Sequence, residues 1–436
     1  MKILLVTAWY FPFIHPRAHR WTAIAEHWAK EGHTVQVLTA QVKECTHFQN
    51  LNGVQVHRVG FDSLKEWFFY RFGTRMARGR VGGLPKKPGL LGRVAAWGYQ
   101  VIWKNLFFPD DACIWYFPAR RKLKQLLEQE NFEVIITVSL PFTGHLLGLF
   151  AHRYKFKHPA KPFWIADIGD PFSFQAKPPN NPLLFDRINR RLERRVLETA
   201  DAITVTTPAT LLKYRQQFGE RSVANISVLP PLLTNPLLAG SPLHVFPSKS
   251  IKIGYFGALY APTRTPDAFL DLLAQTFSKR PDLRTRLEIH FYGEVFPEFY
   301  AKLSAEPGIH LHGLQGRADA WLAMQSMDIL LNIGNTTDFQ LPSKAVDYLA
   351  SGKPVLHLSY VDQDPFVSFF KDFPALFVLK MDHRGLWEGD IDRWLHWLES
   401  EKPCLTQEEI AARVAPYQLS RIAGQYLALI SPRSPE

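Results

Sequence analysis

Residues 2–7 read KILLVT and residues 34–38 read TVQVL, two short apolar runs typical of buried strands. Between them the apolar positions recur at helical spacing, and these are Trp21, Ile24, Ala25 and Trp28. Gly32 then stands where a left-handed C-terminal cap belongs. A strand, a helix and a second strand in this order form a parallel strand–helix–strand unit. The opening of the chain therefore predicts an α/β fold.

The same alternation of strand and helix patterns continues along the chain. In the first half, strand patterns occupy residues 133–138, 163–166 and 202–205. After a charge-free, proline-rich stretch at 222–248 they resume at residues 251–256, 287–292, 309–311, 329–333 and 354–358. We expect two doubly wound, Rossmann-like domains that face each other across a cleft, where such domains bind ligands. The expected boundaries are 1–236 for the first domain, 237–415 for the second, and 416–436 for a terminal segment that could pack back on the first.

The composition excludes several classes of protein. The chain has 436 residues, of which 46% are hydrophobic and 21% charged, so it is not disordered, collagen-like or a coiled coil. Its 3 cysteines have no paired spacing, which excludes a disulfide scaffold and favours a reducing, cytoplasmic compartment. The apolar stretch 134–152 is interrupted by Pro141 and Gly144, so we expect a strand, a loop and a helix there rather than a membrane span.

Positive charge is concentrated in the first half of the chain. Residues 1–236 contain 32 Lys and Arg against 17 Asp and Glu, whereas the remainder is mildly acidic. An insertion is expected at about 62–108, and its basic residues are interleaved with aromatic ones such as Trp67, Phe68 and Phe69. This mixture is typical of a surface that lies on an anionic bilayer. Nucleic acid and a solvated insertion are the alternatives, although no nucleic-acid recognition motif accompanies the segment.

Residues 340–358, QLPSKAVDYLASGKPVLHL, predict a helix with a polar stripe of Ser343, Asp347 and Ser351, followed by a strand. Free N–H groups at the helix start, the Ser343 hydroxyl and the Lys344 ammonium would suit a diphosphate. Asp347, one turn further, could accept hydrogen bonds from ribose hydroxyls. An ordinary amphipathic helix with an exposed polar face is the alternative.

Other signatures are absent or ambiguous. No Gly-x-Gly-x-x-Gly string and no phosphate-binding P-loop occur, which argues against dehydrogenase and ATPase activity. Asp362 with Asp364, and Asp390 with Asp392, could each hold a divalent cation on a sugar nucleotide. Both pairs also suit turn and helix-cap carboxylates. A metal-dependent transferase that uses Asp362 and Asp364 is therefore the alternative enzyme.

The string SKAVDYLASGKPV at residues 343–355 resembles the nucleotide-binding helix of glycosyltransferase family 4 and its relatives, which have the GT-B fold. Further strings resemble the same family, in the same order, along nearly the whole chain. They are GHTV at 32–35, FPD at 108–110, SLPF at 139–142, ADIGDPF at 166–172 and IGYFGALY at 253–260. The middle three are similar to acceptor-side motifs of a bacterial subgroup, and the last to the start of the donor domain.

The resemblance implies which residues form the donor site. By analogy, Gly257, Arg264, Ser343 and Lys344 contact the nucleotide-sugar, Asp347 binds the ribose, and Arg264 and Lys344 are the catalytic cations. The nucleotide-sugar is then a co-substrate, and no cofactor and no metal are expected. Retention of the anomeric configuration is also implied.

Three further residues are candidates in the first domain. Asp170 and His145 are candidate catalytic residues on the acceptor side. Asp170 suits a turn or cap carboxylate equally well, and His145 lies in an apolar helical pattern that suits a core histidine. Arg20 begins the first long helix and could reach a phosphate.

The predicted function is transfer of a sugar from a nucleotide-sugar to a hydroxyl of a glycan or lipid-linked acceptor, in cell-surface polysaccharide or glycolipid biosynthesis. We expect a cytoplasmic enzyme, peripheral on the inner face of the plasma membrane, that does not bind nucleic acid. The alternative is a catalytically degenerate GT-B protein that binds membrane or nucleic acid. Phe339, where the family often has Glu, and the lack of a glycine pair in the first loop favour that alternative.

Overall fold

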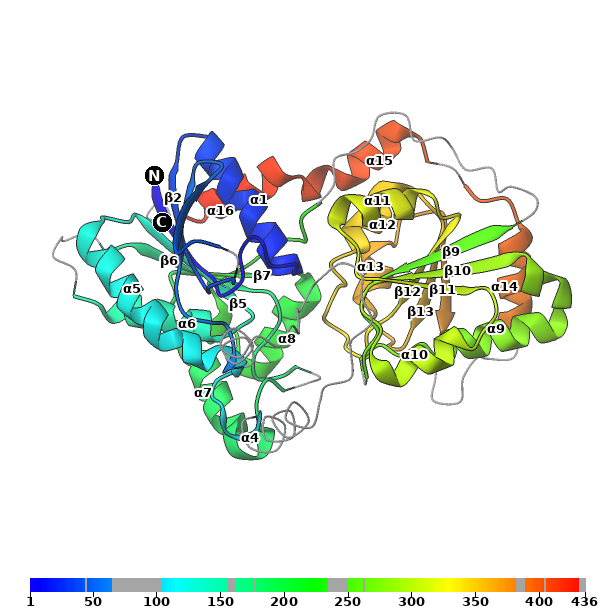
Figure 1. Cartoon of the computed structure of the whole chain (residues 1–436), viewed down its shortest axis with the longest axis horizontal. Helices are drawn as coiled ribbons and strands as arrows, with labels where there is room; N and C mark the ends of the chain where they lie inside the picture. The colour runs from blue at the N-terminus through cyan, green and yellow to red at the C-terminus, as the bar shows by residue number, and fades with distance from the viewer. Residues whose placement is uncertain are drawn as a thin grey trace. The chain divides into compact units, whose positions relative to one another are not determined.

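The chain forms two compact units (Figure 1). The computed structural model describes residues 1–43, 45–64, 104–155, 161–175, 178–233, 250–261, 263–381, 389–403 and 405–430. Of these, the residues up to Leu232 and from Leu419 onward form unit 1, and Leu233–Gln418 form unit 2. Most of the insertion expected at 62–108, including Trp67, Phe68 and Phe69, lies outside the described residues.

Unit 1 is built on a sheet that is parallel except at one edge. Its described strands have the order β3-β4-β2-β1-β5-β6-β7-β8. Their bounds are β1 (Lys2–Val6), β2 (Thr34–Thr39), β3 (Phe48–Leu51), β4 (Val54–Arg58), β5 (Val134–Ser139), β6 (Phe163–Ile168), β7 (Ala202–Val205) and β8 (Ile226–Val228). The long apolar patterns thus form strands at the predicted positions.

The antiparallel edge of this sheet was not predicted. β3 pairs with β4 through a turn at Asn52 and Gly53, which have φ angles of 49° and 88°. Both angles are positive, a conformation that Asn and Gly tolerate at the centre of a hairpin turn. The Asn-Gly pair in the sequence was therefore a usable hairpin signal.

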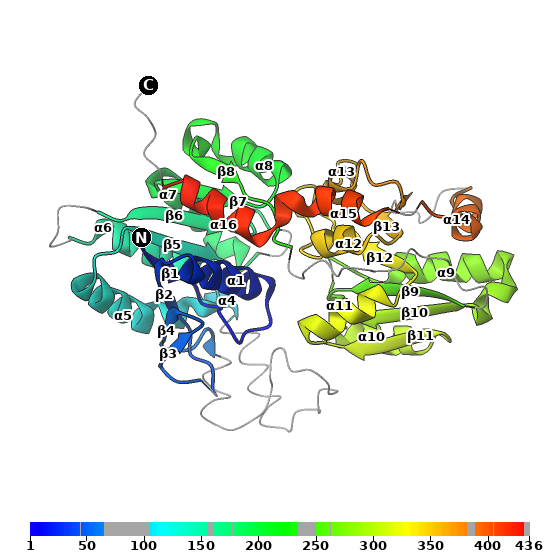
Figure 2. The same cartoon turned by 90° about the horizontal axis from the view of Figure 1, so that it is seen from above.

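Helices cover both faces of the unit 1 sheet (Figure 2). One face packs against α1 (Pro16–Lys30) and α16 (Leu419–Ala428). The other packs against α5 (Tyr116–Gln129), α6 (Thr143–Arg153), α7 (Pro182–Thr199) and α8 (Pro208–Phe218), and the short α4 (Lys104–Leu106) precedes them in the chain. The predicted apolar stripe of α1 is buried, because Trp21, Ile24, Ala25 and Trp28 all lie in the core.

The chain returns to unit 1 after it has built unit 2. α16 packs beside α1, and its Ile422, Ala423 and Tyr426 are fully buried. The Trp28 indole N–H donates to the Ala423 carbonyl at 3.3 Å, and the rings of Trp21 and Tyr426 lie 4.9 Å apart. The last described helix is therefore part of the core of unit 1.

Unit 2 repeats the doubly wound plan with a sheet whose described strands are all parallel. The strand order is β11-β10-β9-β12-β13-β14, with bounds β9 (Ile251–Phe256), β10 (Leu287–Tyr292), β11 (Ile309–Gly313), β12 (Ile329–Ile333), β13 (Val355–Ser359) and β14 (Leu376–Lys380). One face packs against α9 (Asp267–Lys279), α10 (Pro297–Ser304) and α14 (Asp390–Glu399). The other packs against α11 (Arg317–Gln325), α12 (Ala345–Ser351), α13 (Pro365–Phe369) and α15 (Gln407–Val414). Two Rossmann-like sheets are thus present, which confirms the predicted fold class.

Within the described ranges, no helix combines the length and the apolar character needed to cross a bilayer.

A pair of helical glycines tests the packing of unit 1. In Gly148→Ala, the new Cβ would lie 2.3 Å from the Trp164 ring, so we expect the free energy of unfolding to fall by about 1–3 kcal/mol. In the control Gly424→Ala, on the exposed side of α16, the Cβ meets nothing within 4 Å. That substitution should stabilise the helix by roughly 0.5–1 kcal/mol. Urea unfolding measures both, and equal stability of the two variants would contradict the packing at Gly148.

Candidate active site

The carboxyl ends of β9 and β10 come close together in unit 2. The Gly257 N–H donates to the Tyr292 carbonyl at 2.9 Å. Gly293 has a φ of 135°, and a Cβ there would lie 2.2 Å from the Gly257 carbonyl oxygen. Only glycine fits at Gly293. No side chain therefore covers the backbone at this position, on the edge of the sheet where doubly wound folds bind ligands.

Arg264 belongs to the connection that follows β9 and is held toward the end of β12. A short antiparallel bridge pairs Arg264 with Tyr260. The Arg264 Nε donates to Asn335 Oδ1 at 2.8 Å, and Asn335 Nδ2 donates to the Gln340 carbonyl at 3.2 Å. The structure therefore links the predicted cation Arg264 to the segment that leads into α12.

Ser343 and Lys344 precede α12 rather than lie within it, because the helix begins at Ala345. Ser343 is exposed and Lys344 is partly exposed. The Lys344 Nζ lies 3.2 Å from Asp347 Oδ2, and the Asp347 side chain is buried. Asp347 is thus paired with a cation before any ligand arrives.

The predicted polar stripe on this helix is only partly correct. Ser351 does not face solvent: it is buried, and its hydroxyl donates to the Tyr348 carbonyl at 2.6 Å. Gly352 ends the helix in the left-handed conformation with a φ of 66°, as the sequence predicted. The alternative of an exposed polar face is also wrong, since both Asp347 and Ser351 point into the unit.

Arg317 was not predicted as part of this region. It is the first residue of α11, on the same face of the sheet as α12. Burial lowers the pKa of Arg317, and the negative charge of Asp347 opposes that shift. Its Nε is buried and has no partner among the described residues. Asp347 therefore lies near two cations, an arrangement that only the tertiary structure reveals.

The two Asp-x-Asp pairs do not converge on a common point. Asp362 is exposed and lies 3.8 Å from Lys380, whereas Asp364 is buried, caps α13 and lies 2.8 Å from His357 Nε2. Asp390 and Asp392 likewise separate, the first pairing with Arg393 and the second with Lys279. No group of three or more His, Cys, Asp or Glu side chains suited to a metal occurs in the part of the chain that the structure describes.

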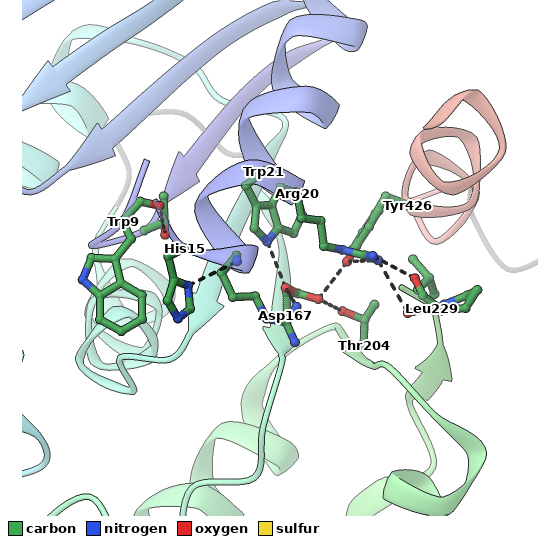
Figure 3. Close-up of polar contacts among 11 residues, drawn as sticks. Trp9, His15, Arg20, Trp21, Asp167, Thr204, Leu229 and Tyr426 are labelled. Atoms are coloured by element: carbon green, nitrogen blue, oxygen red, sulfur yellow. Dashed lines mark hydrogen bonds and ion pairs between the residues drawn. The ribbon is translucent and has the colours of Figure 1, made fainter. Parts of the chain in front are cut away.

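In unit 1, a buried carboxylate at the end of β6 collects four hydrogen bonds (Figure 3). Asp167 Oδ2 accepts from Arg17 Nη1 at 3.0 Å and from Trp21 Nε1 at 2.9 Å. Asp167 Oδ1 accepts from the Thr204 hydroxyl at 2.6 Å and from the Tyr426 hydroxyl at 2.7 Å. Burial by itself would raise the pKa of Asp167, but Arg17, Arg20 and the hydroxyl donors hold it below its usual value. Asp167 therefore stays ionised at neutral pH.

Arg20 is a structural residue, so the prediction that it could reach a phosphate is wrong. Its guanidinium is buried, donates to the Pro230 carbonyl at 2.7 Å and lies 3.2 Å from the Tyr426 hydroxyl. Figure 3 shows it turned toward Tyr426 and Leu229. The first-turn arginine that stays partly exposed is Arg17, with 12% of its side chain accessible.

The structure places His145 in the core of unit 1. It is fully buried on α6, and burial lowers its pKa to about 3, so it is neutral at physiological pH. Its Nδ1 lies 2.7 Å from the Thr137 hydroxyl, which also accepts a hydrogen bond from Trp164 Nε1. The Nε2 atom is buried and has no hydrogen-bond partner among the described residues. These contacts agree with the core-histidine alternative.

Asp170 lies three residues beyond Asp167, in the loop after β6. It is half-buried, and its charge contributes to raising the pKa of the buried Tyr214. Asp167 and Asp170 belong to the same ADIGDPF string, and the sequence analysis named Asp170 as a candidate but did not single out Asp167. The signal that separates them is position, since Asp167 lies within β6 and Asp170 beyond it.

Comparisons with known proteins agree with this architecture. Residues 18–231 match the family described as glycosyl transferase 4-like domain. Similar solved structures include sucrose-phosphate synthase from Thermosynechococcus elongatus, with 12% identity over 98% of each chain and a TM-score of 0.63. The catalytic domain of starch synthase IV from Arabidopsis thaliana, bound to ADP and acarbose, has 11% identity over 99% of each chain and a TM-score of 0.61. Anabaena HepE in complex with UDP and glucose has 13% identity over 99% of each chain and a TM-score of 0.58. No curated protein sequence matches the chain.

The two Rossmann-like units and these likenesses define a protein of the GT-B fold. Residues 18–231 match a glycosyltransferase 4-like domain, in agreement with the resemblance seen in the motifs.

Loss of the buried carboxylate should destabilise unit 1 strongly. Asp167→Asn leaves the buried Arg20 without its counter-charge, so we expect the free energy of unfolding to fall by about 3–5 kcal/mol. The control Asp186→Asn removes an exposed carboxylate that pairs with Arg190, and it should change stability by about 0–1 kcal/mol. Urea unfolding at pH 7 compares the two. Similar losses in both would show that Asp167 is not the centre of the network.

Proposed function

We propose that the chain transfers a sugar from a nucleotide-sugar bound by unit 2 to an acceptor hydroxyl bound by unit 1. One observation carries this proposal: Arg264 is tied through Asn335 to the segment that presents Ser343 and Lys344. Cations from two separate connections are thus held at the carboxyl side of one parallel sheet. That arrangement suits the diphosphate of a nucleotide-sugar.

The cations would act on the leaving group. Breaking the anomeric C–O bond builds negative charge on the diphosphate, and Arg264 and Lys344 would stabilise that charge in the transition state. We infer that no metal takes this role, and that the reaction retains the anomeric configuration, as the family resemblance implies. The fold neighbours include proteins solved with ADP or with UDP and glucose, which supports a nucleotide as the ligand class.

Asp347 has a second role in this proposal. Its carboxylate lies near both Lys344 and Arg317, so its charge stays compensated if Lys344 turns toward a phosphate. Asp347 would then accept hydrogen bonds from the ribose hydroxyls, which would mainly strengthen nucleotide binding.

A panel of UDP-, GDP- and dTDP-sugars tests the activity. We expect transfer, slow hydrolysis or thermal stabilisation with at least one donor, and no such response from any donor would refute the proposal. Lys344→Ala and Arg264→Ala should lower turnover by about ten- to a hundredfold, because each removes a charge-assisted contact. Asp347→Asn should mainly raise the donor KM. As a control, Lys371→Ala removes an exposed cation of unit 2 elsewhere and should leave the kinetics unchanged.

The proposed acceptor is lipid-linked, and an exposed apolar patch on unit 1 supports this. The patch joins the tip of α7 with α4 and the start of α5, and its exposed residues are Leu106, Phe117, Leu183, Leu184 and Ile188. Phe108 connects these elements, since its ring lies 5.2 Å from Phe185 and it lines a concave surface together with Phe117. Leu183 is 94% exposed, and together with its neighbours it forms a contiguous apolar surface among the described residues.

The charges next to this patch support an anionic bilayer as its partner. The tip of α7 reads PLLF, and the following turns carry Arg187, Arg190 and Arg191. Apolar side chains followed by arginines suit a surface that inserts at the headgroup level and binds lipid phosphates. The basic, aromatic segment expected at about 62–108 includes α4 near its end, and most of the rest falls outside the described residues. We propose a cytoplasmic enzyme that is peripheral on the inner face of the plasma membrane, does not bind nucleic acid, and serves cell-surface polysaccharide or glycolipid synthesis.

Vesicle flotation tests the membrane surface. Binding should rise with the fraction of anionic lipid, fall with salt, and be weakened in Leu183→Ser/Leu184→Ser and in Trp67→Ser/Phe68→Ser/Phe69→Ser. Leu212→Ser is the control, because Leu212 is similarly exposed on α8 and lies outside the patch. Binding that ignores lipid composition, or that falls equally in the control, would contradict the proposal.

One observation favours the alternative of a catalytically degenerate protein. Phe339 is buried, so the position where the family often has a carboxylate contributes to the core here. Nucleotide binding without turnover on any acceptor would support that alternative.

A further inference from the structure

Arg17 belongs to α1, and its guanidinium packs against Gly169, directly after the carboxyl end of β6 in unit 1. A Cβ at Gly169 would overlap the guanidinium, with its centre 1.9 Å from Nη2, 2.1 Å from Nε and 2.2 Å from Cζ. The guanidinium thus fills the space that the glycine leaves open. Its Nη1 donates to Asp167 at 3.0 Å, which anchors one end of the group.

The stability of the Asp167 network does not depend on this contact alone. Asp167 also accepts hydrogen bonds from Trp21, Thr204 and Tyr426, and the buried Arg20 provides a second positive charge. Two arginines therefore surround one carboxylate. Two positive charges thus face one negative charge, which leaves a net charge of one positive unit. Arg17 is the arginine of the two that remains partly exposed.

The charge of Arg17 is also unfavourable for the helix that carries it. Arg17 lies in the first turn of α1, and this first turn contains no acidic residue. The positive end of a helix dipole disfavours a cation at that position. A cation kept at an unfavourable position is expected where it serves a ligand rather than the fold.

The remaining donors of Arg17 define the chemistry of that ligand. Nε and Nη2 have no hydrogen-bond partner among the described residues, and neither atom is sealed from solvent. Both nitrogens pack against Gly169 and still have N–H groups that can donate to an oxygen of a phosphate or carboxylate. The carboxyl edge of a doubly wound sheet is the usual location of such a ligand.

We propose that Arg17, anchored by Asp167 and seated on Gly169, binds an anionic group of the acceptor, a phosphate or a carboxylate. This inference rests on the proposed function only where it assigns the anion to the acceptor. The acceptor class is then an anionic saccharide or a phosphate-bearing carrier, and a neutral sugar would lack this contact.

Direct binding tests the site without any requirement for turnover. The full chain with Lys344→Ala/Arg264→Ala removes the donor-site cations, and inorganic phosphate or methyl glucuronide is titrated into it by calorimetry at low salt. In this background, Arg17→Gln should weaken binding about ten- to a hundredfold, and Arg17→Lys should restore part of it. The phosphate and glucuronide arms distinguish the two sources of negative charge.

Two further variants separate a built site from diffuse attraction. Gly169→Ala keeps every charge and displaces the guanidinium, so it should also weaken binding. Arg121→Gln removes an exposed cation of α5 and should leave binding unchanged. The proposal is overturned if neither probe binds the background protein, if Arg17→Gln binds as well as the background, or if Arg121→Gln loses as much affinity. Donor hydrolysis by the otherwise wild-type chain, measured separately, reports on the proposed function itself.

Discussion

The buried carboxylate of Asp167 is the contact on which unit 1 depends. Removing a carboxylate from water is strongly unfavourable unless hydrogen bonds and opposite charges replace the water. Here the replacements come from α1, β7 and α16, so the ionised group can exist only when all three elements are in place. A helix that follows all of unit 2 in the chain is thereby built into the core of unit 1. The core of unit 1 is therefore complete only when α16 has packed against α1.

The charged side chains of the two units fall into two groups, according to their burial and the number of their hydrogen-bond partners. Arg20 in unit 1 and the His357–Asp364 pair in unit 2 are buried and make several hydrogen bonds, and they hold neighbouring elements together. Arg17, Arg264 and Lys344 are different, because each is held by neighbouring side chains and still remains partly exposed. A cation held in this way has a defined orientation and is accessible to a ligand. The extent of pairing thus separates supporting charges from those suited to binding anions.

The same distinction applies to the hydrophobic residues. Trp21 and Trp28 sit at helical spacing and are buried between α1 and α16, whereas Leu183 and Leu184 begin a helix and remain exposed. Exposed leucines at a helix tip do not contribute to the core of unit 1, and the arginines behind them make the surface amphipathic. The fold neighbours, at 11–13% identity, show that this architecture tolerates almost complete replacement of its residues. What has to persist is the burial pattern of the strands and helices.

Local pattern determined the elements of this protein, because strand and helix periodicities are carried by neighbouring residues. The sequence alone predicted the strands at 251–256 and 329–333, the apolar stripe of α1 and the cap at Gly352, and even the unpredicted β3–β4 turn had its signal in Asn52-Gly53. The partners of the charged groups were decided only by the tertiary structure. Arg17 and Arg20 differ in burial, and Arg317 is far from Asp347 in the chain, so neither the partly exposed arginine nor the second cation near Asp347 could be chosen in advance. Burial and long-range contact arise from the assembly of whole elements, and no spacing within a single element encodes them.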